Sequence, residues 1–573
     1  MDRPQGKSTT SINLLHILCL IIIFLTLKQI NLNAVNSAIL ELLSIFSLTA
    51  KSFTILLCLL SFSIYSFYEV YWKRRFLPPG PVPWLVAGNM PQVLLHGASN
   101  IDLLLQKWNK YYGGIFTFWM GPIPMVMVSD VDLLKKYFIR NGDVFSGRWQ
   151  NFITHMFMDG HNGIIQIQGD KWREQRRFSL HVLRDFGFGR TAMEEKIKLE
   201  VRALITHLNT KFDSSKNVTT EAFDVSKPVA VCIANIINSI LFSRIYAHDD
   251  PSFIRVQQML DEQSSLVVKP IMGLYLCFPW TVNLPLLGNA WRQLKQIRYD
   301  FWGFLEGHIS EHLREFNNKT GDLINSSDFI FAYLNEMERR KIENEENGNE
   351  GIWGILELII LIFKKQLKML LLDLFFAGSE TTVTTTKWGL ILLILHPQVQ
   401  ERCFEEINAK LGQNEPELKD KNKLVYLSAT ICEIQRIANI LPINLLRTCL
   451  EDIQVDNFHF KAGTMVLPQI SITMNDSAYF YEPEKFNPER FIEINKFGEL
   501  MLKKVDAFLP FSIGKRQCLG ESLARAELFF IFAYLIKNFK FLPESEDTLP
   551  STKRIYGLTC APQPFKCRLI ARS

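Results

Sequence analysis

The ten cysteines of this 573-residue chain lack the spacing of a metal or disulfide framework. None forms a C-x2-C pair or stands beside a histidine at zinc-finger spacing. They also do not cluster as they would in a small disulfide-rich domain. We therefore expect most of them to be reduced, buried and to behave as small apolar residues, in a body that faces the cytosol.

Long basic runs and nucleotide-binding glycine patterns are missing as well. The 63 Lys and Arg exceed the 58 Asp and Glu by only five charges, and no basic run interleaves with aromatics, so nucleic acid is not expected as a partner. No G-x-G-x-x-G pattern and no internal repeat is visible. Hydrophobic residues reach 48%, which provides enough apolar material for a large, mostly helical core.

Two apolar stretches precede the main body, at residues 12–27 and 53–68. Both are short for a membrane crossing, which typically needs about 20 residues. The first could instead be a signal-peptide core and the second a buried core helix. Lys73-Arg74-Arg75 follows the second stretch, and Pro78-Pro79-Gly80-Pro81 forms a stiff break after it. We predict an anchor of one or two membrane segments whose basic trio lies in the cytosol.

The predicted organisation is therefore an N-terminal membrane-anchor region, residues 1–77, and one large domain, residues 78–573. The fold class is mainly α with a smaller β-rich portion. Helical periodicity dominates from Lys171 onward. We expect a β-hairpin at 115–128, β-structure at 450–467, a long helix that ends at Leu395, and a helix after Cys518 that reaches about Phe539. The run 352–363 is unusually apolar for the loop expected before the long helix, and two interpretations stay open: an added membrane-contacting turn or an artefact of the gene model.

The segment from Phe511 to Gly520, FSIGKRQCLG, contains a cysteine in an unusual setting. Cys518 stands just before an apolar-periodic helix, where free backbone N–H groups favour an anion such as a thiolate. Gly514 and Gly520 would let a flat group approach the backbone. Arg516 could reach a carboxylate on that group, and Phe511 could shield the sulfur. A structural cysteine would explain none of these neighbours.

This segment resembles the haem-ligand signature of the cytochrome P-450 superfamily, Phe-x-x-Gly-x-Arg-x-Cys-x-Gly. The resemblance implies the fold of that family, a haem b cofactor and Cys518 as the axial ligand of its iron. Such ligation favours O–O cleavage. The resemblance extends over roughly residues 78–570. The stretches 172–180 and 185–189 are similar to the microsomal drug- and steroid-metabolising branch, invertebrate members included.

The long helix contains Ala377-Gly378-Ser379-Glu380-Thr381-Thr382. Small residues at 377 and 378 would open a gap on the helix face, and the Thr381 hydroxyl can bond back to the carbonyl of Ala377. Glu380 and Thr381 form an acid–alcohol pair able to pass protons. A threonine in a helix is usually unremarkable by itself. Here the segment resembles the family's oxygen-activation motif, which implies that Glu380 and Thr381 are catalytic.

Further polar residues are placed by the resemblance. Glu433 and Arg436 stand three residues apart on one helix face, which alone is most often a solvated pair. In the family, this pair and a later arginine, here Arg490, form a buried structural lock. An indole and a guanidinium at a one-turn spacing are suited to a haem propionate, although an exposed basic helix is the alternative. The implied propionate ligands are Trp172, Arg176 and Arg447.

The resemblance implies a monooxygenase of the endoplasmic-reticulum membrane, its catalytic domain facing the cytosol. It would insert one atom of O2 into a lipophilic small molecule such as a steroid, fatty acid or xenobiotic. Electrons would come from NADPH through a separate flavoprotein reductase, and cytochrome b5 is a further partner the resemblance admits. Two alternatives stay open: a haem-thiolate isomerase or dehydratase that uses no O2, and a non-catalytic haem-binding protein. The implied pocket residues are Phe375, Ala377, Ile443, Leu445 and Leu558, and the expected docking residues for the reductase are Lys171, Arg173 and Lys515.

Overall fold

The computed structural model describes residues 37–96, 101–186, 191–212, 218–219, 221–247, 250–318, 328–346 and 353–572. The first predicted apolar segment, 12–27, lies outside these residues. The chain forms two compact units that divide between Trp72 and Lys73. This division falls a few residues before the boundary that the proline-rich break suggests.

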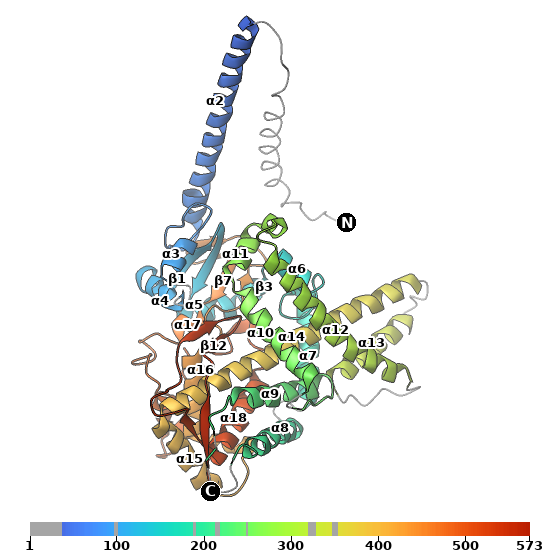
Figure 1. Cartoon of the computed structure of the whole chain (residues 1–573), viewed down its shortest axis with the longest axis vertical. Coiled ribbons are helices and arrows are strands. Elements are labelled where there is room, and N and C mark those ends of the chain that lie inside the picture. Colours follow the sequence, from blue (N-terminus) through green and yellow to red (C-terminus); the bar gives the residue numbers. More distant parts are fainter. Residues whose placement is uncertain are drawn as a thin grey trace. The chain divides into compact units, whose positions relative to one another are not determined.

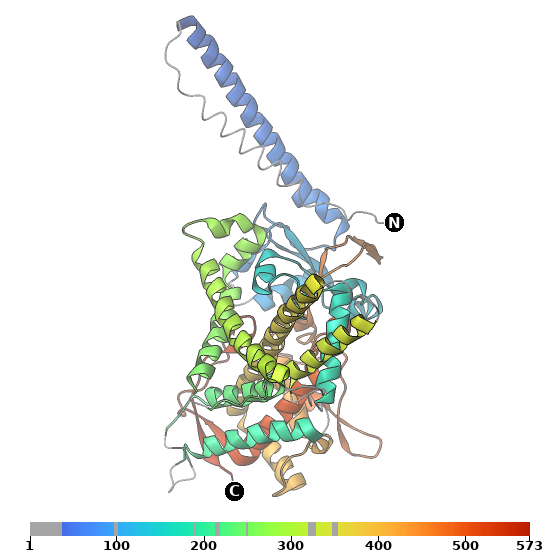
Figure 2. The ribbon, with the colours of Figure 1, turned by 90° about the vertical axis from the view of Figure 1, so that its right-hand side faces the viewer.

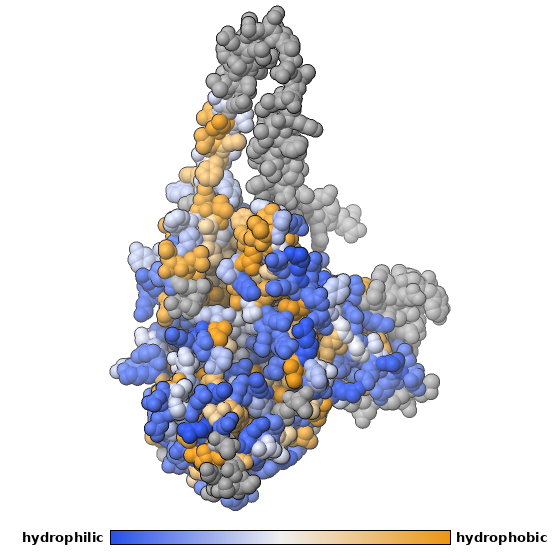
Figure 3. All heavy atoms as spheres, viewed as in Figure 1, coloured by the Kyte–Doolittle hydropathy of each residue, from blue (hydrophilic) through white to orange (hydrophobic). Residues whose placement is uncertain are grey.

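The first unit contains helix α2 (Ser37–Phe67) and the π-helical turn η1 (Tyr68–Trp72). The apolar side chains described in α2, from residue 52 onward, are mostly exposed: Phe53 and Leu56 each expose 62% of their surface. Figure 3 shows this apolar surface in orange along the described part of α2. Among the described residues, no helix combines the length and the apolar character that a membrane crossing requires.

The second unit, from Lys73 onward, is mainly helical, as predicted (Figures 1 and 2). It opens with the short 3-10 helix η2 (Lys73–Phe76), which contains the basic trio. Its longer helices are α4 (Ile101–Tyr112), α7 (Gly169–Asp185), α8 (Thr191–Asn209), α9 (Ser226–Leu241), α10 (Pro251–Val267), α12 (Asn289–Asn318), α13 (Phe329–Glu346), α14 (Trp353–Leu395), α15 (Pro397–Leu411), α16 (Val425–Ala438) and α18 (Glu521–Asn538). The shorter ones are α3 (Met90–Leu95), α5 (Val131–Lys135), α6 (Phe152–Phe157), α11 (Pro270–Cys277) and α17 (Ile470–Thr473).

Helix α14 is the longest helix of this unit, with 43 residues, and appears in yellow in Figure 1. It packs against α9, α12, α16 and α18. The expectation that residues 352–363 form a loop is wrong, because the backbone from Trp353 onward is already part of α14. The run is rich in leucine and isoleucine and has no proline, so nothing in it interrupts a helix.

The β-structure is small; the strands at 115–128 and 453–467 lie where the sequence predicts them, whereas the strand at 147–148 and the strands after residue 490 were not predicted. Strands β1 (Ile115–Met120) and β2 (Ile123–Val128) form the expected hairpin, with Ile115 opposite Val128. Strand β2 pairs in parallel with β7 (Met465–Pro468), which pairs with β4 (Arg447–Thr448), and β4 pairs with β3 (Gly147–Arg148). The two-stranded pairs are β5 (Ile453–Val455) with β6 (Phe458–Phe460), β8 (Ile492–Ile494) with β9 (Leu500–Leu502), β10 (Phe539–Pro543) with β13 (Cys567–Ala571), and β11 (Arg554–Tyr556) with β12 (Cys560–Pro562).

The main hydrophobic core joins α8, α9, α14, α16 and α18. Helix α16 is buried along almost its whole length and ends at Asn439, which adopts a left-handed conformation with φ of 38°. Helix α18 is likewise buried from Ala526 to Ile536. These buried helices fix the position of the loop that precedes α18.

Candidate functional site

The loop from Phe511 to Gly520 folds back on itself before helix α18. The amide of Cys518 donates to the carbonyl of Phe511 at 3.0 Å. Gly514 has a φ of +76°, and a Cβ there would lie 1.8 Å from the carbonyl oxygen of Phe138. The protein's own backbone therefore requires a glycine at 514, a reason the sequence did not suggest. A Cβ at Gly520 would meet no atom within 4 Å, so this side of the loop is open.

Cys518 is set apart from the other cysteines. Among the described cysteines of the body, it alone has an exposed side chain. Protein nevertheless surrounds the thiol on most sides, and this desolvation raises its pKa, while the amide of Gly520 acts to lower it. The sulfur is thus accessible to a bound group but shielded from bulk water. A metal that binds a thiol deprotonates it outright, so the raised pKa does not oppose ligation.

Three buried arginines gather beside this loop. Arg148 and Arg447 face each other across strands β3 and β4, and Arg516 lies in the short 3-10 helix η9 (Gly514–Arg516). Their exposed fractions are 6%, 2% and 7%. Arg516 donates to the carbonyls of Ser146 at 2.8 Å and Ile167 at 2.6 Å. Cations directly opposite each other on adjacent strands repel, so this arrangement needs compensation.

The electrostatics of the cluster point to an anionic ligand. Burial, with the nearby charges of Arg148, Arg447 and Arg176, lowers the pKa of Arg516 to about 7. Burial and neighbouring arginines also hold the pKa of Arg447 well below its usual value, and its Nε has no hydrogen-bond partner. Within the described part of the chain, no carboxylate forms an ion pair with any of these four arginines. The Asp373 carboxylate acts on Arg148 from beyond ion-pair distance. Buried cations with so little compensation are costly, so the site fits a group that brings carboxylates, as the two propionates of haem would.

The predicted propionate ligands lie in this cluster. The Trp172 ring is buried, with the Arg516 guanidinium 3.9 Å and the Arg176 guanidinium 5.8 Å from its centroid. Arg176 donates from Nη2 to the carbonyl of Gln517 at 2.7 Å, which ties α7 to the cysteine loop. Sequence reasoning missed Arg148. The available signal was an arginine inside the otherwise apolar segment that also contains Phe145 and Trp149.

Helix α14 presents small and polar residues to the site. The Thr381 hydroxyl donates to the carbonyl of Ala377 at 2.7 Å, the bond that the sequence suggests. Ala377 is exposed. Gly378 has a different reason to be small, because a Cβ there would lie 2.6 Å from Cδ1 of Ile237 on α9. Helix packing, rather than an approaching planar group, therefore accounts for the glycine at 378.

Glu380 is held by hydrogen bonds. The Thr559 hydroxyl donates to its Oε1 at 2.7 Å, and the Ser264 hydroxyl is 3.5 Å from the same oxygen. Burial raises the pKa of Glu380, and the Thr559 bond opposes this effect. A carboxyl with a raised pKa can hold a proton nearer to neutral pH than an exposed one. Glu380 and Thr381 can therefore act as an acid–alcohol pair.

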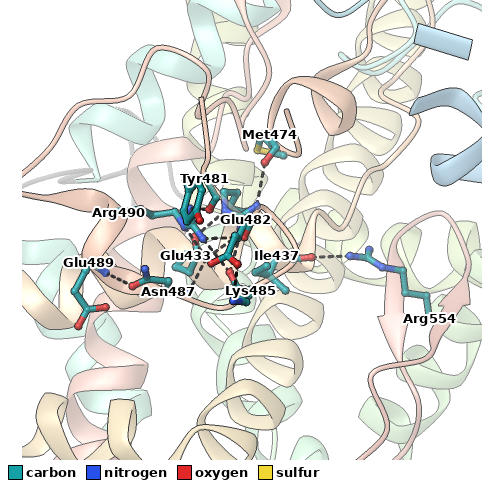
Figure 4. Close-up of polar contacts among 11 residues, drawn as sticks. Glu433, Ile437, Met474, Tyr481, Glu482, Lys485, Asn487, Glu489, Arg490 and Arg554 are labelled. Carbon is teal, nitrogen blue, oxygen red and sulfur yellow. Dashed lines mark hydrogen bonds and ion pairs between the residues drawn. The ribbon is translucent and has the colours of Figure 1, made fainter. Parts of the chain in front are cut away.

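Glu433, Arg436 and Arg490 form one network, in which Glu433 and Arg436 are fully buried and the Arg490 side chain exposes 9% of its surface (Figure 4). Arg436 donates to both Glu433 oxygens, at 2.7 and 2.8 Å, and Arg490 donates to Oε1 at 3.0 Å. The amide of Asn487 donates to Oε1 as well. The remaining guanidinium donors reach backbone carbonyls, including that of Lys485. The network thus fixes the segment at 474–490 onto α16.

The predicted pocket residues are not all brought together. Phe375 exposes only 1%, and its ring packs with Phe242 and Phe304. Phe375 and Ala377 are two positions apart, which corresponds to about 200° around the helix axis, so their side chains lie on opposite faces of α14. Leu558 lies beside Thr559 and donates its amide to Ser264 at 3.1 Å. The remaining two, Ile443 and Leu445, are partly buried and precede Arg447.

The predicted docking residues have partners within the chain. Arg173 pairs with Asp170 at 2.6 Å, and Lys515 lies 3.4 Å from Asp143. Lys171 donates to the carbonyl of His161 at 2.6 Å, and burial lowers its pKa. The ion pairs of Arg173 and Lys515 are exposed and therefore weak, so they leave both side chains able to exchange partners.

Comparison with known proteins agrees with this geometry. The family model for cytochrome P450 matches residues 78–569. Cytochrome P450 2C23 of Rattus norvegicus is 34% identical over 91% of this chain and 99% of its own length. Cytochrome P450 2D10 of Mus musculus is 33% identical over 87% and 93%, and cytochrome P450 2J2 of Homo sapiens is 33% identical over 86% and 90%.

The chain belongs to the cytochrome P450 family. It is therefore a haem-thiolate monooxygenase, similar to microsomal members of the 2C, 2D, 2B and 2J groups. The buried arginines and the accessible Cys518 are the residues of this chain that suit such a cofactor.

Proposed function

We propose that this enzyme inserts one atom of O2 into a lipophilic small molecule such as a steroid, fatty acid or xenobiotic. The second oxygen atom leaves as water, and NADPH supplies two electrons through a separate flavoprotein reductase. When bound, a haem with a thiolate ligand supplies the activation of O2. Cys518 would hold the haem iron, and the residues around it would bind and orient the haem and supply protons.

One observation carries the oxygen-dependent role. The Thr381 hydroxyl donates to the carbonyl of Ala377, four residues earlier on α14, and Glu380 stands next to it. This bond holds the hydroxyl at the face of α14 that is exposed at Ala377, next to the Glu380 carboxyl, whose pKa is raised by burial. An isomerase, a dehydratase or a non-catalytic haem-binding protein needs neither group. The acid–alcohol pair therefore favours the monooxygenase over both alternatives.

The haem-holding roles are proposed on contacts and charge. Arg447, Arg516 and Arg148 are buried cations that lack carboxylate partners within the described residues, and Arg176 and Trp172 lie against them. These side chains suit the propionates. Phe511 stacks with the Arg525 guanidinium, 4.7 Å from its ring centroid, and the open side of Gly520 lies at the same loop.

We further propose association with the endoplasmic-reticulum membrane, with the body in the cytosol. The exposed apolar side chains of α2 support this, because water-exposed apolar surface of this extent is unfavourable. The Lys73–Arg75 trio that follows favours the cytosolic side. Lys171, Arg173 and Lys515 are proposed to contact the reductase, and also cytochrome b5 as a further electron donor; the ion pairs of Arg173 and Lys515 are exposed and exchangeable.

Reconstitution of the full chain with haem, a flavoprotein reductase and NADPH tests this function. We expect a reduced, CO-bound spectrum with the long-wavelength band of thiolate ligation, and NADPH-dependent oxygenated product from at least one compound in a panel of steroids, fatty acids and aromatic xenobiotics. Product formation without NADPH or O2 would favour the isomerase. A thiolate spectrum with no NADPH consumption under any condition would favour a binding protein.

A further inference from the structure

The carboxyl of Glu380 is held by two segments that are distant in sequence. The first is the turn before strand β12, where the Thr559 hydroxyl donates to Oε1 at 2.7 Å. The second is helix α10, where the Ser264 hydroxyl lies 3.5 Å from the same oxygen. Thr559 and Ser264 expose only 2% and 7% of their surfaces. Buried hydroxyls need hydrogen-bond partners, and both of these have the Glu380 carboxyl as their acceptor.

The hydrogen bonds continue beyond these two hydroxyls. The Thr384 hydroxyl, one turn after Glu380 on α14, lies 3.3 Å from the Thr559 hydroxyl. The amide of Leu558 donates to the Ser264 hydroxyl at 3.1 Å. Since the Leu558 amide can only donate, the Ser264 oxygen accepts from it through a lone pair. The proton of the Ser264 hydroxyl is then directed to Glu380.

A hydroxyl at 559 satisfies both protonation states of the carboxyl. When Glu380 is ionised, Thr559 donates to it and accepts from Thr384. When Glu380 carries the proton on Oε1, it donates to Thr559, which then donates to Thr384. A hydroxyl both donates and accepts, so the chain of bonds reverses direction without movement of a side chain. A valine of the same shape could do neither.

The charged groups that face Glu380 are few. Asp261 on α10 raises the pKa of the carboxyl and Lys387 on α14 lowers it, although burial has the largest effect. Asp261 is itself partly desolvated, with a raised pKa. The Thr559 hydroxyl lowers the pKa of Glu380, so its removal should raise that pKa further.

We propose that Thr559 is a positioning residue for the Glu380 carboxyl: its hydroxyl, assisted by that of Ser264, fixes the carboxyl in one orientation whether or not it carries a proton. This inference rests on the proposed function, in which Glu380 holds a proton for oxygen activation. It assigns a role to the turn at 558–559 and to helix α10, which hold the acid from two sides.

The test uses the haem-loaded full chain with reductase and the compound from the panel that gives most product. In Thr559→Val, we expect product per NADPH to fall by about two- to tenfold, the loss expected for one hydrogen bond to the neutral, protonated carboxyl. The protonated acid is the active form, and its pKa rises, so the alkaline limb of the coupling profile should move to higher pH. Thr559→Ser should restore both quantities. Ser264→Ala should produce a smaller loss.

The matched control is Thr386→Val, on the same helix. Thr386 is fully buried and its hydroxyl donates to the carbonyl of Thr382 at 2.9 Å, away from Glu380. This variant should couple as the wild type does. A merely structural role of Thr559 would change the folded fraction and haem content but leave the pH limb in place.

Two further measurements separate this inference from the proposed function. Infrared difference spectra between acid and alkaline pH report the Glu380 carboxyl, identified by its loss in Glu380→Gln, and its midpoint should rise in Thr559→Val. In the Glu380→Gln background, Thr559→Val should add no further uncoupling. If Glu380→Gln uncouples and Thr559→Val does not, or if the two effects add, the positioning role is overturned and the proposed function stands. If Glu380→Gln couples as the wild type does, both are overturned.

Discussion

Replacement of Glu433 by glutamine should destabilise the body more than any exposed charge change nearby. Glu433 is fully buried and accepts two bonds from Arg436, one from Arg490 and one from the amide of Asn487. Loss of its charge leaves two buried guanidinium groups without a counterion. Removal of one partner from a buried ion pair costs about 3–5 kcal/mol.

The expected shift in melting temperature follows from the size of the body. Lys73–Ser573 amounts to about 500 residues, and an unfolding entropy of about 2 cal/mol/K per residue gives about 1 kcal/mol per degree. Glu433→Gln should therefore lower the melting temperature by about 3–5 °C. Absorbance of the bound haem and far-UV circular dichroism, recorded at one fixed scan rate, would both follow the transition.

Glu482→Gln is the control. Glu482 pairs with Lys485 at 2.6 Å beside the same network, but both side chains are exposed, by 39% and 61%. An exposed pair contributes about 0–1 kcal/mol, so this variant should shift the melting temperature by about 1 °C or less. Equal shifts for Glu433→Gln and Glu482→Gln would refute the view that the buried network fixes the segment at 474–490.

Three further outcomes are expected. The Thr381→Ala variant should retain its haem but release hydrogen peroxide in place of oxygenated product. Peroxide and product assays should show a yield of product per NADPH that is lower by about 10²-fold or more. Unchanged coupling would contradict the role of the Thr381 hydroxyl. Arg447→Met should weaken haem retention, measured by haem transfer to apomyoglobin, more than Arg173→Met does. Arg447 is a buried cation of the cluster, whereas Arg173 is exposed. Equal haem retention in the two variants would argue against propionate binding by Arg447. Removal of residues 1–72 should leave a body that binds haem and leaves the membrane in high salt, assayed by sedimentation; a chain that no longer folds would place α2 in the core.

Local patterns predicted much of the fold. The hairpin of β1 and β2 follows from two apolar runs on either side of Gly121-Pro122, and α18 follows from the apolar periodicity after Cys518. The run at 352–363 was expected in a loop, whereas the backbone from Trp353 onward is helical. The run has no proline, so its backbone can continue the hydrogen bonds of α14 toward the N-terminus.

The site was predictable where its residues adjoin a specific motif. Cys518 and Arg516 share one loop, and the Thr381 bond to Ala377 is local to one helix. Arg148 was missed because its role depends on pairing across strands with Arg447, 299 positions later in the sequence. The contact of Glu380 with Thr559 spans a sequence separation of 179 and follows no local pattern.

Glycine was also interpreted too simply. Space for a planar group was the expected reason for Gly378 and Gly514. The structure gives each a neighbour inside the protein, Ile237 for the first and the Phe138 carbonyl for the second. A sequence shows that a side chain is absent, but only the packed structure shows which atoms use the space.

The most direct test of the account is the reduced, CO-bound spectrum of Cys518→Ala, with Cys277→Ala as control. Cys277 is the next most accessible described cysteine of the body, and burial raises its pKa to about 11. We expect Cys277→Ala to keep the long-wavelength band of a thiolate-ligated haem and Cys518→Ala to lose it, together with most of the bound haem. Retention of that band in Cys518→Ala would show that another residue holds the iron and would contradict the site described for this chain.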